Sequence, residues 1–184
     1  MKLIAFFILA LTIPTAHAQT THLTKANITD FITETTKLTA GHTEDLSPDE
    51  IITYLETHLH KNARFKTTMR YEIPGQSPQE NAMRLNKEDF INKIRQSTET
   101  IEDYENEIDI IKIKISKDKR SATIETRSQE NATLPVSDED TGVTQIPMEG
   151  TSLCRQILKL NKKDIIQMYN INCVTDIAFD AGGF

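Results

Sequence analysis

Three segments in the first hundred residues carry apolar side chains at the three- and four-residue spacing of an amphipathic helix. The clearest start is at residues 47–50, where Ser47 can cap the helix, proline occupies its first position and Glu50 reaches back. The predicted helices begin near Thr29-Asp30, at Ser47 and at Asn86, and their apolar faces extend to Leu38, Leu59 and Ile101.

Alternation of polar and apolar residues dominates the second half of the chain and predicts two antiparallel hairpins. The first hairpin turns at 117–120, so that Ser116 pairs with Ser121. This register places Lys112 opposite Glu125, an opposite-charge pair on the exposed face. It also pairs Ile115 with Ala122, Ile113 with Ile124 and Ile111 with Thr126. The predicted strands span 61–73, 104–115, 121–133, 146–160 and 164–179, with loops at 76–84 and 134–145.

The apolar phase changes in the middle of the strand at 104–115. Isoleucines occupy even positions up to Ile110 and odd positions from Ile111 onward. Such a change indicates a β-bulge, which we expect near Asp109 and which bends a long strand. The predicted register places Ser128 opposite Asp109 on a curved sheet.

The chain contains two cysteines, Cys154 and Cys173. If the last hairpin turns at Lys163-Asp164, these residues lie opposite each other, whereas a shift of one residue would put them on opposite faces. An even pair in an exported protein is usually joined, so we predict a disulfide between them. The same register pairs Leu158 with Tyr169 and Gln156 with Ile171.

The first eighteen residues differ in composition from the rest of the chain. Lys2 precedes an apolar run over 3–13, and Ala16-His17-Ala18 puts small residues at the two positions that a signal peptidase reads. The apolar run is too short to cross a hydrocarbon core of roughly 30 Å as a helix. We therefore predict a signal peptide at 1–18 and a periplasmic or secreted location, with no membrane span afterwards. The remaining expected parts are a flexible segment at 19–27, one domain at 28–178 and a frayed tail at 179–184.

The charge balance argues against a nucleic-acid partner, and the spacing of the histidines argues against a metal site. The chain has 27 acidic and 21 basic residues and no clustered basic stripe, which argues against nucleic-acid binding. His58 and His60 are two residues apart, so they would point in different directions on a helix and make a poor metal site. We therefore predict no metal, and the sequence suggests no cofactor.

The element order and three local patterns resemble the nuclear-transport-factor-2-like superfamily, also called SnoaL-like. The patterns are the helix start at 46–50, the hairpin at 116–122 and the strand entry at 150–152, and the resemblance covers roughly residues 28–178. It implies an α+β cone in which three N-terminal helices pack on a strongly curved antiparallel sheet. It also implies a pocket between these layers and frequent dimers. Because members include isomerases, dehydratases and non-catalytic binders, the fold does not select a function.

Five residues are candidates for lining such a pocket: Tyr54, Tyr104, Asp109, Ser128 and Tyr169. Enzymes of the superfamily usually use a carboxylate or histidine with a tyrosine, and Asp109 is the candidate base here if the bulge turns it inward. The alternatives are that Asp109 faces solvent and that each tyrosine packs in the core. The leading hypothesis is an exported, non-catalytic protein that binds a small apolar ligand or a protein partner. The alternatives are an isomerase or dehydratase that uses a pocket carboxylate and a tyrosine, and a dimerising structural subunit of an envelope or secretion assembly.

Overall fold

A computed structural model describes residues 21–39, 46–72, 77–97, 102–138 and 142–179. These residues form three helices and a six-stranded sheet. The helices are α1 (Lys25–Thr39), α2 (Pro48–His58) and α3 (Lys87–Ser97). The strands are β1 (Leu59–Glu72), β2 (Gln79–Asn86), β3 (Glu102–Ile115), β4 (Ser121–Asp138), β5 (Gly142–Leu160) and β6 (Ile166–Phe179).

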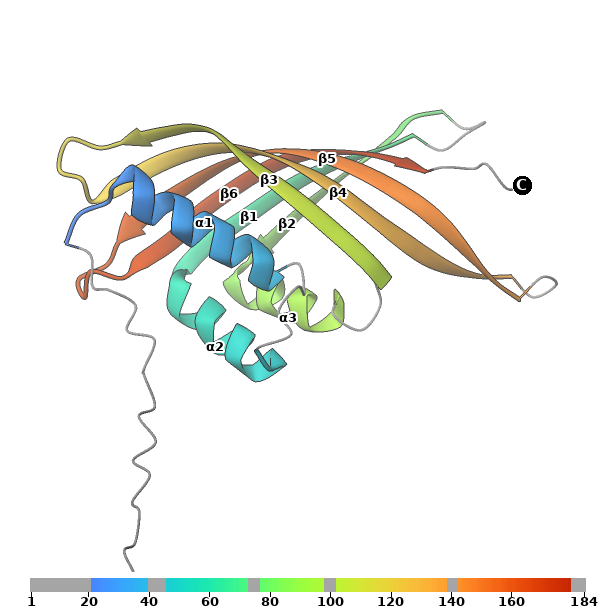
Figure 1. The fold of residues 1–184 in the computed structure, drawn as a ribbon, viewed down its shortest axis with the longest axis horizontal. Coiled ribbons are helices and arrows are strands. Elements are labelled where there is room, and N and C mark those ends of the chain that lie inside the picture. The colour runs from blue at the N-terminus through green and yellow to red at the C-terminus, as the bar shows by residue number, and fades with distance from the viewer. Residues whose placement is uncertain (1–20, 40–45, 73–76, 98–101, 139–141, 180–184) are drawn as a thin grey trace, which may run out of the picture.

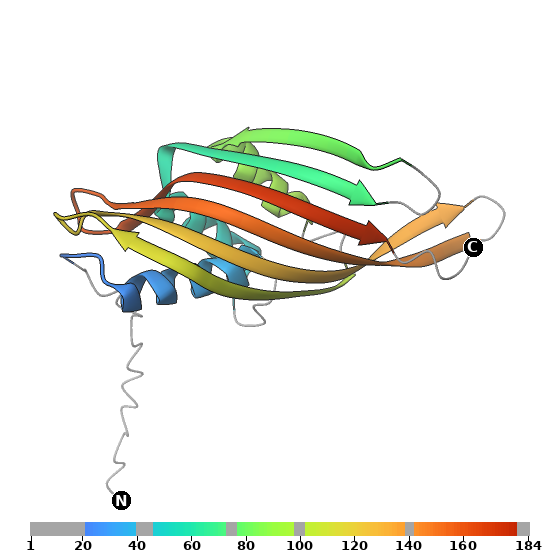
Figure 2. The ribbon, with the colours of Figure 1, turned by 90° about the horizontal axis from the view of Figure 1, so that it is seen from above.

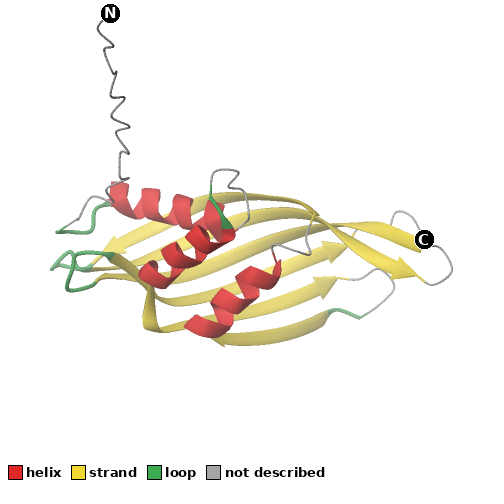
Figure 3. Ribbon diagram, turned by 90° about the horizontal axis from the view of Figure 1, so that it is seen from below, coloured by secondary structure: helices red, strands yellow, loops and turns green. Residues whose placement is uncertain are grey.

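The sheet is curved, and the three helices lie side by side against its concave face (Figures 1 and 3). Its strand order is β2-β1-β6-β5-β4-β3, which can be followed from the convex side in Figure 2. Neighbouring strands are antiparallel except β1 and β6, which are parallel. The predicted α+β cone is therefore confirmed. Its sheet is mixed rather than fully antiparallel, because β1 and β6 are parallel neighbours, although β2 to β5 lie between them in the sequence.

The helix start at residues 47–50 forms as predicted. The Oγ of Ser47 accepts a hydrogen bond from the Glu50 backbone N–H, and the Glu50 carboxylate accepts one from the Ser47 backbone N–H at 2.8 Å. The Ser47 backbone N–H and the Ser47 hydroxyl both donate to this carboxylate, and these two bonds lower the pKa of Glu50 because they stabilise its charged form. The capping box therefore fixes the start of α2 at Pro48.

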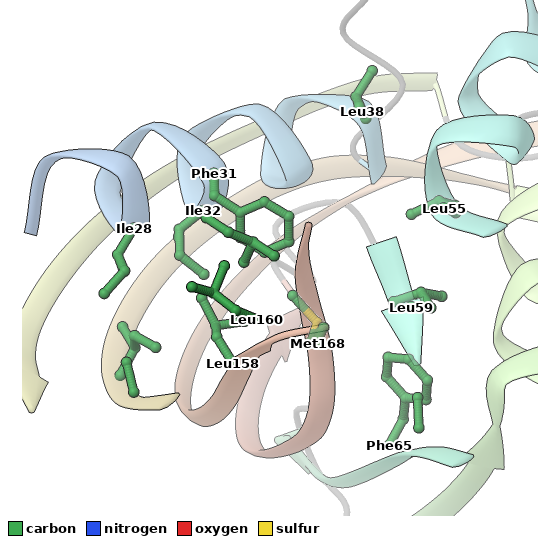
Figure 4. Packing of buried hydrophobic residues seen from close by; sticks show 14 of the residues in the cluster. Ile28, Phe31, Ile32, Leu38, Leu55, Leu59, Phe65, Leu158, Leu160 and Met168 are labelled. Carbon is green, nitrogen blue, oxygen red and sulfur yellow. The ribbon is translucent and has the colours of Figure 1, made fainter. Parts of the chain in front are cut away.

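The core lies between the helices and the half of the sheet next to the 116–121 turn (Figure 4). Inward-facing positions alternate along each strand, as β4 shows with buried Ala122 and Ile124. The largest fully buried side chains are Leu23, Ile28, Ile32, Leu38, Leu55, Leu59, Ile124 and Leu158. The other half of the concave face extends beyond the helices and carries more polar residues.

The predicted register of the first hairpin is confirmed near its turn and wrong beyond it. Lys112 pairs with Glu125 and Ile113 with Ile124, as expected. The bulge lies at Ile111 rather than near Asp109, because Ile110 pairs with Thr126 and Ile111 has no partner in the ladder. Asp109 consequently pairs with Arg127 instead of Ser128.

The predicted register of the last hairpin is also confirmed in one part and wrong in another. Cys154 pairs with Cys173 and Gln156 with Ile171, as predicted. Leu158 pairs with Met168 rather than Tyr169, because an irregularity next to Ile157 and Leu158 places one extra residue in β6. Tyr169 is therefore the extra residue.

Two segments predicted as loops are strands. Residues 79–84 belong to β2, which pairs with β1 and turns the half-buried Met83 and Leu85 inward. Residues 134–138 and 142–145 extend the β4–β5 hairpin. Pro135 is tolerated there because β3 pairing ends at Thr133, so β4 is an edge strand beyond that point.

The first helix begins earlier than predicted. Helix α1 begins at Lys25 rather than near Thr29-Asp30, and it therefore includes residues 25–27. Before the helix, Leu23 is buried and its backbone N–H donates to the Lys119 carbonyl at 2.8 Å. The predicted signal peptide, the continuation of α3 to Ile101 and the tail from 180 onward lie outside the described residues. In the described part of the chain, no helix is both long enough and apolar enough to cross a membrane.

Candidate functional site

A cavity of about 110 Å³ lies between the three helices and the concave face of the sheet. Helix α1, helix α2, the start of α3 and strands β1, β5 and β6 each contribute to its wall. Leu55, Leu59 and Met168 form part of the apolar lining and can be located in Figure 4. The complete lining is Ile32, Thr35, Thr36, Thr39, Leu55, Leu59, Phe90, Gln156, Met168 and Ile171.

The wall contains one buried amide among its apolar and threonine side chains. Gln156 of β5 is 7% exposed, and its Nε2 donates to Thr126 Oγ1 on β4 at 3.3 Å. The wall as described contains no titratable side chain. It can therefore hold an apolar molecule and offer it a hydrogen bond, but it supplies neither a general acid nor a general base.

A buried polar group supports the wall from behind. The Tyr54 hydroxyl hydrogen-bonds to Thr35 Oγ1 at 3.1 Å, and the tyrosine ring packs on His58 at 4.3 Å between centroids. His58 is buried and donates from Nδ1 to the Ile166 carbonyl at 2.8 Å. Burial raises the pKa of Tyr54 to about 12, because it disfavours the phenolate. Tyr54 therefore positions a wall residue and does not itself line the cavity.

This environment predicts an alkaline limit to stability. The folded-state pKa of Tyr54 is above its usual value of 10. The contribution of Tyr54 to the unfolding free energy is therefore complete below pH 10 and is lost as the pH rises towards about 12. Between pH 9 and pH 11 we expect the wild-type protein to lose about 1 kcal/mol more unfolding free energy than Tyr54→Phe. Urea unfolding of both proteins at the two pH values measures this difference. Equal losses in the two proteins would contradict the assignment.

A row of hydroxyl groups and one carboxylate crosses the concave face farther from the helices. Glu130 Oε1 accepts hydrogen bonds from Ser128 Oγ and Ser152 Oγ, both at 3.0 Å. Ser152 Oγ also lies 2.8 Å from Thr175 Oγ1. Along β5 this row is four residues from Gln156, or about 13 Å at the rise of an extended strand. The row is a connected polar network separate from the cavity.

The remaining predicted site residues do not come together. Asp109 is exposed on the convex face, because the bulge lies two residues beyond it. Tyr104 lies on β3, and its side chain is outside the described set. Tyr169 stacks on His60 with ring centroids 3.9 Å apart, and Lys159 Nζ lies 4.4 Å from its centroid. Ser128 belongs to the hydroxyl row. Partial burial, followed by nearby lysine charges, lowers the pKa of His60.

Sequence reasoning singled out Ser128 but missed the inward-facing polar residues Thr126 and Gln156. Thr126 and Gln156 occupy even positions of β4 and β5, the positions at which both strands turn buried side chains towards the helices. A polar residue within an inward-facing alternation was the available signal. It indicates a polar group that must find a partner inside the fold.

A larger hollow of about 820 Å³ lies on the surface between α2, β1 and α3. Its wall mixes cationic, anionic and amide side chains, and Lys87 Nζ already donates to the Glu56 and Leu59 carbonyls. This hollow therefore lacks the apolar lining of a small-molecule site. Within the described ranges, no group of three or more His, Cys, Asp or Glu side chains could hold a metal ion.

Several solved structures share this arrangement. A hexachlorocyclohexane dehydrochlorinase, LinA type 2, has a TM-score of 0.55 and 6% identity, over 86% of this chain and 89% of its own. A conserved protein from Planctomyces limnophilus DSM 3776 has a TM-score of 0.51 and 14% identity, over 82% and 98% of the two chains. The Kfla4162 protein from Kribbella flavida has a TM-score of 0.50 and 14% identity, over 82% and 88%. No protein-family model and no curated protein matches this chain. At these identities the likeness establishes the fold alone.

Proposed function

Because the chain has the cone-shaped fold of the nuclear-transport-factor-2-like superfamily, we propose that it is an exported, non-catalytic protein that holds a small apolar molecule in its cavity. The observation that carries this proposal is the lining of the 110 Å³ cavity, which is apolar except for three threonines and Gln156. A concave apolar site with few polar groups is the usual form of a small-molecule site.

The absence of titratable groups from the described lining supports a binding role over a catalytic one. The enzyme alternative depended on Asp109 facing inward, and this residue is exposed. The carboxylate of the hydroxyl row, Glu130, is bonded to Ser128 and Ser152, and Ser152 is about 13 Å from Gln156 along β5. General acid–base catalysis requires a proton-transfer group within hydrogen-bond reach of the substrate.

Two features support export. The sequence at 1–18 has the charged, apolar and small-residue order of a secretion signal. The disulfide between Cys154 and Cys173 suits an oxidising compartment such as the periplasm or the cell exterior. A binding protein in that location would meet apolar molecules outside the cytoplasm.

Blocking the cavity tests this function. We expect phenol or toluene, added to the purified protein, to bind with one site per chain, and Ile171→Phe to weaken that binding at least tenfold by filling the cavity. The matched control is Ile177→Phe, on the same strand and face but about 20 Å farther along. Titrations followed by NMR chemical shifts measure the affinities. Failure of both probes to bind the wild-type protein contradicts the proposal and favours a protein-partner role.

A further inference from the structure

One buried hydrogen-bonding atom in the cavity wall has no partner. Gln156 Oε1 is inaccessible to solvent and accepts no hydrogen bond, while Nε2 of the same amide donates to Thr126 Oγ1. Leaving a buried amide oxygen unsatisfied costs free energy, and such groups are rare in folded proteins. The free end of this amide belongs to a side chain that lines the cavity.

None of the three threonines in the wall supplies the missing partner, since the Gln156 oxygen accepts no hydrogen bond. Thr35 Oγ1 is hydrogen-bonded to the Tyr54 hydroxyl, and Thr39 Oγ1 donates to the Thr35 and Thr36 carbonyls of its own helix. A bound water molecule typically makes about three hydrogen bonds, whereas most of this wall is apolar. The geometry therefore suits an apolar ligand that brings one polar group of its own.

We propose that the cavity selects a small apolar ring that carries one hydroxyl group, and that this hydroxyl hydrogen-bonds to the Gln156 amide. This inference rests on the proposed function, since it specifies the ligand class of the same site. Phe90, Met168 and Ile171 supply apolar surface for the ring. A dry cavity of about 150 Å³ accommodates benzene, so a cavity of about 110 Å³ has room for no more than one six-membered ring.

A hydroxyl group matches the amide in both of its orientations. With the oxygen free, the ligand hydroxyl donates to Gln156 Oε1, which a rotation of the side chain must first bring to the cavity surface because this atom is closed to a water-sized probe. If the amide is turned over, Thr126 donates to the oxygen, and the ligand hydroxyl accepts from Nε2. A ligand with only a donor or only an acceptor would match one orientation, so the alcohol or phenol class fits this wall best.

Phenol and toluene form a suitable probe pair because they have nearly the same shape and differ in the hydroxyl. We expect the full exported chain, with its disulfide intact, to bind phenol. In Gln156→Leu the ratio of phenol affinity to toluene affinity is expected to fall by about tenfold or more. Gln129→Leu, an exposed position on the outward face of β4, is the matched control and should leave the ratio unchanged. NMR or calorimetric titration gives both affinities for each protein.

The outcomes separate this inference from the proposed function. Binding of toluene but not phenol by the wild type, or an unchanged ratio in Gln156→Leu, overturns the hydroxyl selectivity and leaves the cavity function intact. Failure of both probes to bind overturns both proposals. If Gln156→Leu does not fold, Thr126→Val provides the second test. The Thr126→Val substitution removes the partner of Gln156 Nε2 and leaves both ends of the amide free, so phenol binding should persist. Loss of phenol binding with toluene binding retained overturns the inference.

Discussion

Replacing Leu158 by alanine is expected to reduce the unfolding free energy by about 2–5 kcal/mol. Leu158 lies on β5 with 0% of its surface exposed, and it faces the helices between Ala122 of β4 and Met168 of β6. The substitution removes buried methyl groups and leaves a cavity that the rigid sheet closes only in part. Urea unfolding followed by circular dichroism measures the change.

The same strand supplies the control for this experiment. Leu153 is 49% exposed on the convex face, so Leu153→Ala removes the same atoms without opening a cavity and should change stability by about 0.5 kcal/mol or less. Similar losses in the two variants would show that β5 does not present Leu158 to the core. That result would contradict the assignment of the two sheet faces on which the cavity depends.

Removing the disulfide is expected to cost about 3 kcal/mol. Cys154 and Cys173 join β5 to β6 across a separation of 19 residues, and the chain-entropy estimate for a loop of this length gives that value. The bond lies between Gln156 and Ser152 along β5, and thus next to the cavity wall. Unfolding of the Cys154→Ala, Cys173→Ala double variant should therefore show a large loss of stability.

Reduction of the wild-type protein is the control for the double variant. The reduced wild type and the variant should have similar stability, because both lack the cross-link while the fold is otherwise unchanged. Two thiols that react with an alkylating agent in the native, unreduced protein would show that the bond does not form. Equal stability of oxidised and reduced wild type would show that the cross-link does not constrain the unfolded chain.

Local patterns predicted the parts of the fold that depend on neighbours in the sequence. The capping box at Ser47 and Glu50 needs only four consecutive residues, and it forms as predicted. Pairing of Lys112 with Glu125 and of Cys154 with Cys173 follows from the turn position and the alternation of each hairpin. In each case the interacting groups are close because the chain between them is short.

The positions of the bulges could not be derived in the same way. A bulge at Ile111 and one near Asp109 are both compatible with the change in apolar phase, yet they turn Asp109 to opposite faces. One extra residue in a strand changes the register without changing its composition. The candidate base was therefore misplaced, although the bulge itself was predicted.

The sequence by itself determined the starts of the second and third helices, the two hairpins and the disulfide, because these follow from periodicity and short-range pairing, whereas the cone-shaped architecture was implied by a family resemblance. The tertiary structure alone decided the parallel pairing of β1 with β6 and the composition of the cavity. Thr35, Phe90 and Gln156 are separated by more than fifty residues at each step, and they share one wall because three helices pack on one curved sheet. No local pattern records which distant side chains that packing brings together, or that it leaves the Gln156 oxygen without a partner.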